Sequence, residues 1–225
     1  TQFNNAEDLQ KYPRTLQKDA VLLESLGVHF VFAPTPEEMY STEEMQTRFS
    51  FDFNGLDEVM EGKMRPGHFN GVVQVVSRLF ELVRPTRAYF GEKDFQQLAI
   101  IRHMVEHSAL SSHFNNLKIV GCPIVREASG LALSSRNERL SDSEKQTAVA
   151  ISQTLLASVE WAKTDSIEAV QKRVIDTINA IDGLEVEYYE IVDKSTLQPT
   201  TTFDNAIGCV TVYCGPVRLI DNIQY

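Results

Sequence analysis

Residues 86–98 read TRAYFGEKDFQQL, and this stretch decides the fold. Segment 86–90 is typical of a strand, whereas the apolar spacing that follows, as far as about Ser108, predicts a helix. The junction between them, called the GEKD junction below, consists of Gly91, Glu92, Lys93 and Asp94. A strand that turns directly into a helix indicates a βα unit of an α/β protein.

Strands and helices alternate through the first half of the chain. We expect helices over residues 14–26, 72–83 and 94–108, and strands over residues 28–33, 49–53, 86–90 and 117–125. The run VHFVFA at 28–33 is continuously apolar, as in a buried parallel strand, and phenylalanines alternate at 49–53 as in a strand with one buried face. This alternation predicts a parallel sheet with right-handed crossovers, which binds ligands at the carboxyl ends of its strands. The GEKD junction lies at one such end.

The sequence changes character after about residue 124. A polar loop leads to Ser141, and Glu144 three residues further on predicts a capping box at the start of a helix. We expect helices over residues 141–162 and 166–181, and strands over residues 184–188, 206–214 and 217–222. The sequence therefore predicts an α/β domain over residues 1–124 and a smaller α+β domain over residues 125–225.

The composition excludes several classes of partner. The 225 residues carry a net charge of −10 with a pI of about 5.0, and such a surface repels nucleic acid and anionic lipid. No apolar run approaches the ~20 residues that cross a membrane, and 43% hydrophobic with 23% charged residues is typical of a soluble globular protein. Cys122, Cys209 and Cys214 have no metal-type spacing, and the last two lie in strand-like sequence. We expect buried thiols in a reducing cytosol, and hence a cytoplasmic protein.

Two interpretations of the GEKD junction remain open. In the architectural one, Gly91 allows a tight turn, and Asp94 and Gln97 form a capping box at the helix start. In the other, the first N–H groups of the helix hold a phosphate, and Lys93 adds a full positive charge beside them. The two are compatible, because a cap would also rigidify a turn that a ligand uses.

A second loop has the composition of a phosphate site. The sequence GLALSSRN places Ser134 and Ser135 next to Arg136, just before a helix. Arginine binds phosphate oxygens in a forked geometry, and hydroxyl groups donate to the same oxygens. An exposed polar linker is the alternative. Two such loops in one acidic protein favour a polyphosphate held between the two domains.

The histidines give weaker signals. His103 and His107 lie one helical turn apart without a recognisable third ligand, so surface or half-buried histidines are expected rather than a metal pair. His68 follows a glycine near a helix start, where a cap or packing role is the default and a substrate contact the alternative. Three cations could neutralise a carboxylate substrate, and the residues alone do not choose among them: Arg14, Arg65 and Lys93.

Five blocks of the sequence together resemble one family. They are QF…EDLxxYPRT at 2–15, EGxxRPGHFxGV at 61–72, FGEKDFQQL at 90–98, GLALSSRN at 130–137 and RLIDN at 218–222. In this order, over essentially the whole chain, they resemble the pantoate–β-alanine ligases. The resemblance implies a Rossmann-like nucleotidyltransferase fold, and a cytosolic homodimer that requires Mg²⁺. It also implies a two-step reaction: ATP activates the carboxylate of (R)-pantoate as an acyl adenylate, releasing pyrophosphate, and the amine of β-alanine then displaces AMP.

The resemblance also implies roles by position. The expected ATP-binding residues are Gly91, Glu92, Lys93, Asp94, Val125, Leu133, Ser134, Ser135 and Arg136. The expected catalytic residues among them are Lys93, Ser134, Ser135 and Arg136. Gln2 and Gln97 are the expected pantoate ligands, and Gln2 also lies near β-alanine. Asp19 falls where some relatives place a Mg²⁺ ligand, but its neighbours Lys18 and Ala20 leave the metal site unassigned.

The sequence departs from the family in one motif. Family members carry His-x-Gly-His in the first strand-to-helix turn, and this sequence contains no such motif. We therefore expect the chain to start after that turn and to have little or no turnover by itself. Two alternatives remain: a related adenylate-forming ligase for another acid, and a nucleotide-binding fragment without enzymatic activity.

Overall fold

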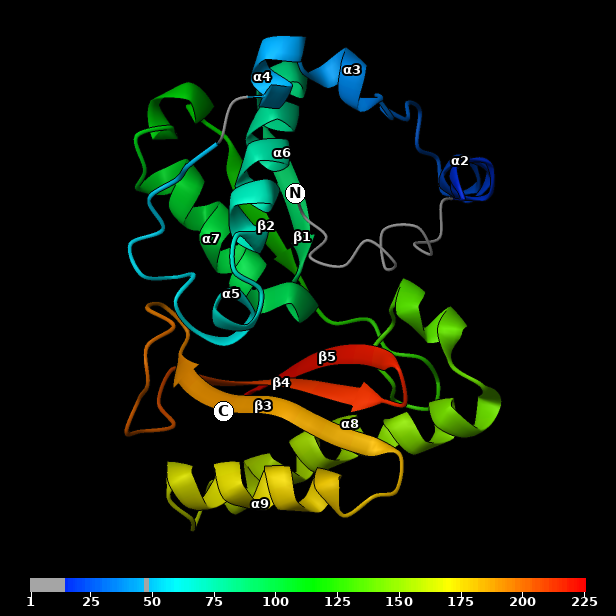
Figure 1. Cartoon of the computed structure of the whole chain (residues 1–225), viewed down its shortest axis with the longest axis vertical. Helices are drawn as coiled ribbons and strands as arrows, with labels where there is room; N and C mark the ends of the chain where they lie inside the picture. Colours follow the sequence, from blue (N-terminus) through cyan, green and yellow to red (C-terminus); the bar gives the residue numbers. More distant parts are fainter. Residues whose placement is uncertain (1–14, 47–48) are drawn as a thin grey trace.

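The computed structural model describes residues 15–46 and 49–225. Its elements form two parts, one above the other in Figure 1. The upper part holds a two-stranded parallel sheet with helices, and the lower part a three-stranded antiparallel sheet covered by two helices. This arrangement confirms the expected α/β class with a smaller α+β part, while the boundary near residue 124 remains a prediction. None of the helices described is both long and apolar enough to cross a membrane.

The parallel sheet contains the βα unit that the sequence predicts. Strand β1 (Arg87–Gly91) pairs in parallel with β2 (Lys118–Cys122), and Gly91 lies opposite Cys122 in the register. A short 3₁₀ helix, η1 (Glu92–Asp94), connects β1 to helix α7 (Phe95–Glu106) at the GEKD junction. The other helical elements of this part are α2 (Leu16–Ser25), α3 (Pro36–Met39), α4 (Thr42–Gln46), α5 (Met60–Met64), α6 (His68–Val83) and η2 (Ser111–Phe114).

The lower part is a sheet whose strands follow the chain order. The strands are β3 (Leu184–Asp193), β4 (Ala206–Cys214) and β5 (Val217–Gln224), with β4 in the centre. The helical elements are η3 (Ser135–Arg139), α8 (Asp142–Trp161) and α9 (Ile167–Asn179). The hydroxyl of Ser141 accepts from the N–H of Glu144 at 3.3 Å, and the Glu144 carboxylate accepts from the N–H of Ser141 at 2.8 Å. The predicted capping box at the start of α8 is therefore confirmed.

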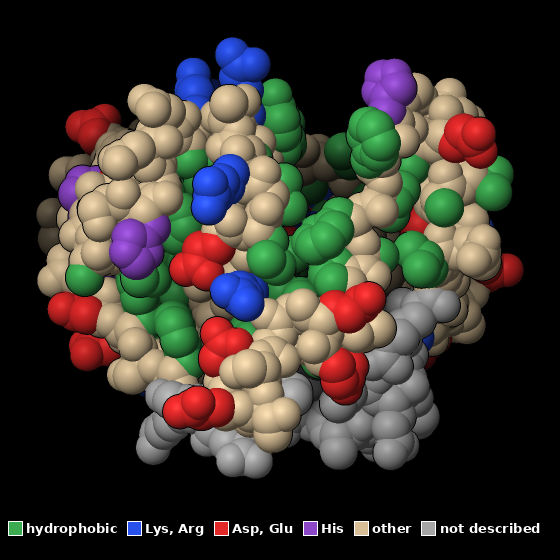
Figure 2. Space-filling model, turned by 90° about the horizontal axis from the view of Figure 1, so that it is seen from above, with side chains coloured by type: hydrophobic (Ala, Val, Ile, Leu, Met, Phe, Trp, Pro, Cys, Tyr) green, Lys and Arg blue, Asp and Glu red, His purple; other side chains and the backbone are tan. Residues whose placement is uncertain are grey.

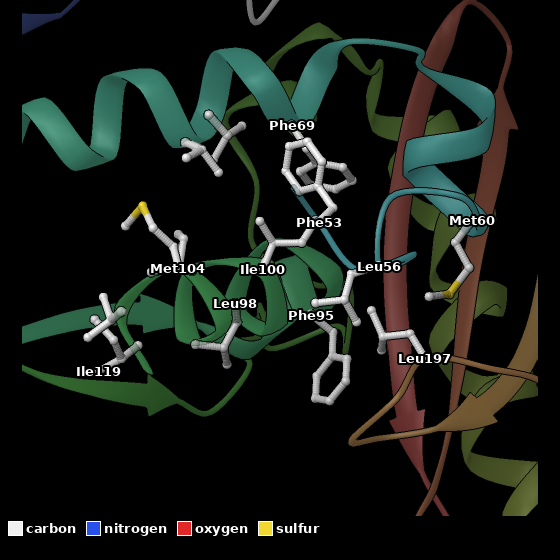
Figure 3. Close-up of a cluster of buried hydrophobic side chains, with 14 of the residues drawn as sticks. Phe53, Leu56, Met60, Phe69, Phe95, Leu98, Ile100, Met104, Ile119 and Leu197 are labelled. Atoms are coloured by element: carbon white, nitrogen blue, oxygen red, sulfur yellow. The ribbon is translucent and has the colours of Figure 1, made fainter. Parts of the chain in front are cut away.

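Two clusters of buried apolar side chains stabilise the molecule. In the first, Phe53, Phe69 and Ile100 lie together between α6 and α7 (Figure 3). This cluster also takes in Leu197 and Ile207 from the lower part, so the two parts share apolar contacts. The second cluster packs α8 and α9 against the antiparallel sheet. Burying an apolar side chain such as leucine or phenylalanine contributes about 1.5–3 kcal/mol to folding. Because the first cluster contains side chains of both parts, its burial holds the upper and lower parts together.

Residues 28–33 form no strand, so this sequence prediction is wrong. Their side chains are exposed, and Phe30 is 91% accessible. An apolar segment becomes a strand only where a neighbouring backbone takes up its hydrogen bonds, and β1 and β2 pair with no third strand among the residues described. Helix α2 likewise buries none of its residues. Figure 2 shows hydrophobic side chains at the surface around a hollow in the face seen from above.

Residues 49–53 also form no strand, although their burial was predicted correctly in part. Phe53 is only 5% exposed, and its ring meets that of Phe51 edge-on at 4.9 Å. The backbone bonds to a helix rather than to a strand, because the N–H of Phe51 donates to Oδ1 of Asn70 on α6 at 3.1 Å. Alternating burial thus arises here without a β-ladder.

Candidate active site

A pocket lies where the upper and lower parts of the molecule meet, and we call it the central pocket. Its wall combines α5, the start of α6, η1 and the first turn of α7 with residues of η3 and all three antiparallel strands. Among the residues described, four basic side chains line it: Arg65, Lys93, Arg136 and Arg218. Three acidic side chains of the described part line it as well: Glu61, Asp94 and Asp221. The excess of basic groups suits an anionic ligand, although the whole chain is acidic.

The central pocket brings together residues that the sequence analysis selected from separate loops. Lys93, Asp94 and Gln97 reach it from the GEKD junction and α7, and Arg136 reaches it from η3. Arg65, one of three candidate cations for a carboxylate, also lines the pocket. Gln2 and Arg14 lie outside the residues that the structure describes.

The other selected residues lie around the central pocket rather than on its wall. Ser134 lines a small adjoining cavity that shares Ile220 and Asp221 with the pocket. Val125 and Leu133 are 66% and 55% exposed, and the N–H of Leu133 donates to the carbonyl of Val125 at 2.9 Å. Gly91, Glu92 and Ser135 are likewise not among the lining residues.

The local structure of the GEKD junction differs from the architectural interpretation. Asp94 has φ −92° and ψ 60° and makes no side-chain bond that caps α7, so the predicted capping box with Gln97 is wrong. The reason is that η1 inserts a 3₁₀ turn where a cap needs extended backbone. The Asp94 carboxylate instead pairs with Nζ of Lys93 at 3.5 Å. Gly91 has an ordinary φ of −68°, so the turn does not need a glycine for its backbone angles.

Glu61 of α5 connects the two parts of the molecule at the pocket. Its Oε1 accepts from Nη2 of Arg218 at 2.6 Å, and its Oε2 from Nη1 at 2.9 Å. Oε1 also accepts from the hydroxyls of Tyr188 at 2.9 Å and Thr211 at 3.1 Å. Burial raises the pKa of this carboxyl, but the hydrogen bonds and charge of Arg218 outweigh it, and the pKa falls from 4.5 to about 2. The same contacts raise the pKa of Arg218 despite its burial. Glu61 is therefore charged throughout the physiological range.

Arg65 extends this charge network along the pocket wall. Its Nη1 lies 3.4 Å from Oε2 of Glu61 and 3.3 Å from Nε2 of His68. Burial lowers the pKa of Arg65, the carboxylate of Glu61 opposes this, and the charges of Arg218 and Arg136 lower it further. His68 lines the pocket and its ring lies 5.0 Å from that of Phe69, so its position is compatible with both the packing role and the substrate contact that the sequence left open.

Residues that the sequence analysis did not select complete the site. Glu61 and Arg218 lie in two of the quoted blocks, as do Asp221 and Asn222, but no role was attached to any of them. Ion pairs between distant segments have no sequence periodicity, and only the blocks EGKMRPGH and RLIDN signalled these positions.

A second hollow, beside α4 and α6, has the opposite charge balance. Among the residues that the structure describes, Glu43, Glu44 and Glu81 line it with Arg78 as the one basic residue, so this part of the hollow suits an anion poorly. Arg78 is also engaged, because its Nε donates to the carbonyl of Met39 at 2.8 Å. The central pocket is therefore the better candidate for a phosphate or carboxylate.

His103, His107, Cys209 and Cys214 have the degree of burial that the sequence predicts. The rings of His103, on α7, and His107, just after it, stack at 6.0 Å, and the two residues are half-buried and exposed respectively. Within the described part of the chain, no group of three or more His, Cys, Asp or Glu side chains is placed to hold a metal ion. Cys209 and Cys214 are buried and free, and burial raises the pKa of the Cys209 thiol.

The structure is that of an α/β protein with a parallel βα unit in its upper part. Basic side chains from the upper and lower parts line one pocket, which suits anionic small molecules. The family model described as Pantoate-beta-alanine ligase matches residues 1–224. The pantothenate synthetase of Phocaeicola vulgatus is 60% identical over the whole of this chain and 78% of its own length. The chain therefore belongs to the pantoate–β-alanine ligase family.

Solved structures agree with this membership. The pantothenate synthetase of Thermus thermophilus superposes with a TM-score of 0.90 at 40% identity, over 99% of this chain and 79% of that one. A pantoate–β-alanine ligase of Francisella tularensis, solved as a complex with beta-gamma ATP and beta-alanine, gives a TM-score of 0.75 at 32% identity, over 100% of this chain and 75% of that one.

Proposed function

We propose that the central pocket is where this ligase condenses (R)-pantoate with β-alanine, using ATP and a pantoyl-adenylate intermediate. The observation that carries the proposal is the meeting of Lys93, Gln97 and Arg136, from both parts of the molecule, on one pocket wall. Family membership supports the reaction, and the Francisella relative was solved with a form of ATP and β-alanine.

In the first step a pantoate carboxylate oxygen attacks the α-phosphorus of ATP and pyrophosphate leaves. The carboxylate is already ionised at neutral pH, so the step needs alignment and charge stabilisation rather than a general base. Lys93 and Arg136 would place positive charge beside the phosphate oxygens, and the start of α7 adds its partial positive charge. Gln97, in the first turn of α7, would orient pantoate.

In the second step the amine of β-alanine attacks the acyl carbon and AMP leaves. Arg65, which lines the pocket close to His68, is the candidate for the substrate carboxylate. Val125 and Leu133 present an exposed apolar surface beside the second loop, where the nucleotide base would contact the backbone. Ser134 and Ser135 would donate to the phosphates, and Gln2 would contact pantoate and β-alanine.

Three further properties belong to this proposal. Mg²⁺ would accompany ATP, since in nucleotide sites it is held largely by phosphate oxygens and water. The protein would act as a homodimer in the cytoplasm. Light scattering tests the dimer, with a mass of one chain as the contradicting result.

Substitution of Lys93 by alanine tests its proposed role in stabilising charge on the phosphates. In Lys93→Ala, made in a ligase that also carries the His-x-Gly-His motif, pantoate-dependent ATP–pyrophosphate exchange should slow on the order of a hundredfold, because charge stabilisation in the transition state is lost. The Kd for pantoate should change far less. Lys63→Ala is the matched control, because Lys63 is an exposed lysine of α5 that does not line the pocket. Equal losses in exchange and in pantoate affinity would contradict the role given to Lys93.

A further inference from the structure

The RLIDN block has a structural role that the proposed reaction does not yet explain. Asn222 of β5 is only 4% exposed, although β5 belongs to the lower part of the molecule. Its side-chain amide crosses to the upper part, where Nδ2 donates to the carbonyls of Glu92 at 2.8 Å and Lys93 at 3.0 Å. One side chain therefore holds the backbone of η1, the segment from which Lys93 projects into the central pocket.

The chemistry of this contact restricts the residue that can make it. An amide NH₂ carries two N–H donors on one atom, so it can satisfy two neighbouring carbonyls at once. A carboxylate of the same shape carries only acceptors and would repel both carbonyls. Holding these carbonyls also fixes the orientation of the peptide units on either side of Lys93.

The neighbouring residue extends the connection to the second loop. Asp221, 5% exposed, accepts from the backbone N–H of Asn222 at 2.8 Å through Oδ1. Both of its oxygens also pair with Arg126, at 2.7 and 3.0 Å. Nη1 of Arg126 donates in addition to the carbonyl of Gly130 at 3.2 Å. Arg126 and Gly130 begin the loop that leads to Arg136.

We propose that Asp221 and Asn222 are positioning residues for adenylation. Asn222 sets the place of the Lys93 backbone, and Asp221 sets the loop that carries Ser134 and Arg136 through Arg126. Because the two residues are adjacent on one strand, the phosphate-binding groups of the two parts keep a fixed spacing. The inference rests on the proposed function in so far as it places ATP phosphates between these groups.

Asn222→Asp is the direct test, since it keeps the shape of the side chain and removes both donors. We expect the Kd for ATP to rise on the order of tenfold or more, because misplacing catalytic groups by a fraction of an ångström is costly. In a ligase that also carries the His-x-Gly-His motif, the rate of ATP–pyrophosphate exchange should fall on the order of tenfold or more for the same reason. The Kd for pantoate should change less than about threefold, a split that a general loss of stability would not produce. Asn205→Asp is the matched control: its Nδ2 also donates twice, to Asp193 at 2.9 Å and Ser195 at 3.1 Å, in an exposed turn.

Hydrogen exchange gives a readout that needs no ligand. Asn222→Asp should speed amide exchange in residues 92–97, and Arg126→Lys, which keeps the charge but loses the forked contact, should speed it in residues 126–137. If Asn222→Asp matches Asn205→Asp in ATP affinity and in the hydrogen-exchange rates of residues 92–97, the inference is wrong. If the unaltered protein binds no ATP, the proposed function fails. The hydrogen-exchange rates of residues 92–97 then still decide whether Asn222 holds the turn. If Asn222→Asp does not fold, Arg126→Lys tests the proposal instead. Unchanged ATP affinity together with unchanged amide hydrogen exchange in residues 126–137 would overturn the proposal.

Discussion

The ion pair between Glu61 and Arg218 joins the upper and lower parts and should make the free energy of unfolding fall at acidic pH. We consider Glu61→Gln, which keeps the shape of the side chain and one acceptor oxygen but removes the charge. The pKa of Glu61 is about 2 in the folded protein against 4.5 as its ordinary value. At about 1.4 kcal/mol per pKa unit, the charged carboxylate contributes about 3 kcal/mol to the free energy of unfolding at neutral pH. The variant should lose about this amount, since Arg218 loses the carboxylate of Glu61 and keeps Glu187 as its ionic partner among the residues described.

The pH dependence follows from the direction of the pKa shift. A carboxyl whose pKa is lowered on folding stabilises the protein fully above its ordinary pKa and loses that contribution as the pH falls towards its folded pKa. For Glu61 this window runs from about pH 4.5 down to about pH 2. The difference in unfolding free energy between the parent and Glu61→Gln should therefore shrink to roughly less than half by pH 3. Urea unfolding followed by circular dichroism at pH 7 and pH 3 measures both quantities.

An exposed pair of the same chemistry provides the control. Glu81 pairs with Arg78 at 3.3 Å, and its side chain is 41% exposed. Glu81→Gln should cost less than about 1 kcal/mol, because water screens such pairs. The reasoning fails if Glu61→Gln costs no more than Glu81→Gln, or if its cost is the same at both pH values.

Two further substitutions test the region around the pocket. Gly62→Ala should lower the free energy of unfolding by about 3 kcal/mol or more, measured by urea unfolding, because a Cβ would lie 2.1 Å from the backbone oxygen of Asp57; a near-neutral result would mean that α5 packs differently. Gln97→Ala should raise the Kd for pantoate by calorimetry and leave stability unchanged, whereas Gln96→Ala should cost about 1–3 kcal/mol of stability, because its buried amide serves two backbone carbonyls. Reversed effects of these two variants would show that the roles of the glutamines are exchanged.

Local signals in the sequence predict the elements that depend on neighbours in the chain. The βα unit at 86–98 and the Ser141 capping box are present in the structure because each is decided within a few residues. The prediction of a strand at 28–33 is wrong because a strand there depends on a partner strand elsewhere in the chain. The prediction of a cap at Asp94 is wrong because a single 3₁₀ turn moves Asp94 out of the geometry that a cap requires.

In the site, too, the features that depend on local sequence could be predicted, and those that depend on distant segments could not. Loop composition and resemblance select Lys93, Gln97 and Arg136, which line one pocket. They do not reveal that Glu61 meets Arg218, because residues so distant in the chain pair only after the upper and lower parts have packed together. Contacts that set the spacing of the site therefore need the structure, whereas the groups expected to contact phosphate can be read from the sequence.

Activation of pantoate as an acyl adenylate is the central chemical step of the proposed reaction. Pantoate carrying heavy oxygen in its carboxylate, incubated with ATP, β-alanine and a form of the ligase that also carries the His-x-Gly-His motif, tests this directly by mass spectrometry of the products. Attack on the α-phosphorus and later loss of AMP leave one heavy oxygen in AMP, which is the predicted result. Heavy oxygen in inorganic phosphate with ADP as the other product, or pantothenate formed with unlabelled AMP, would contradict the account.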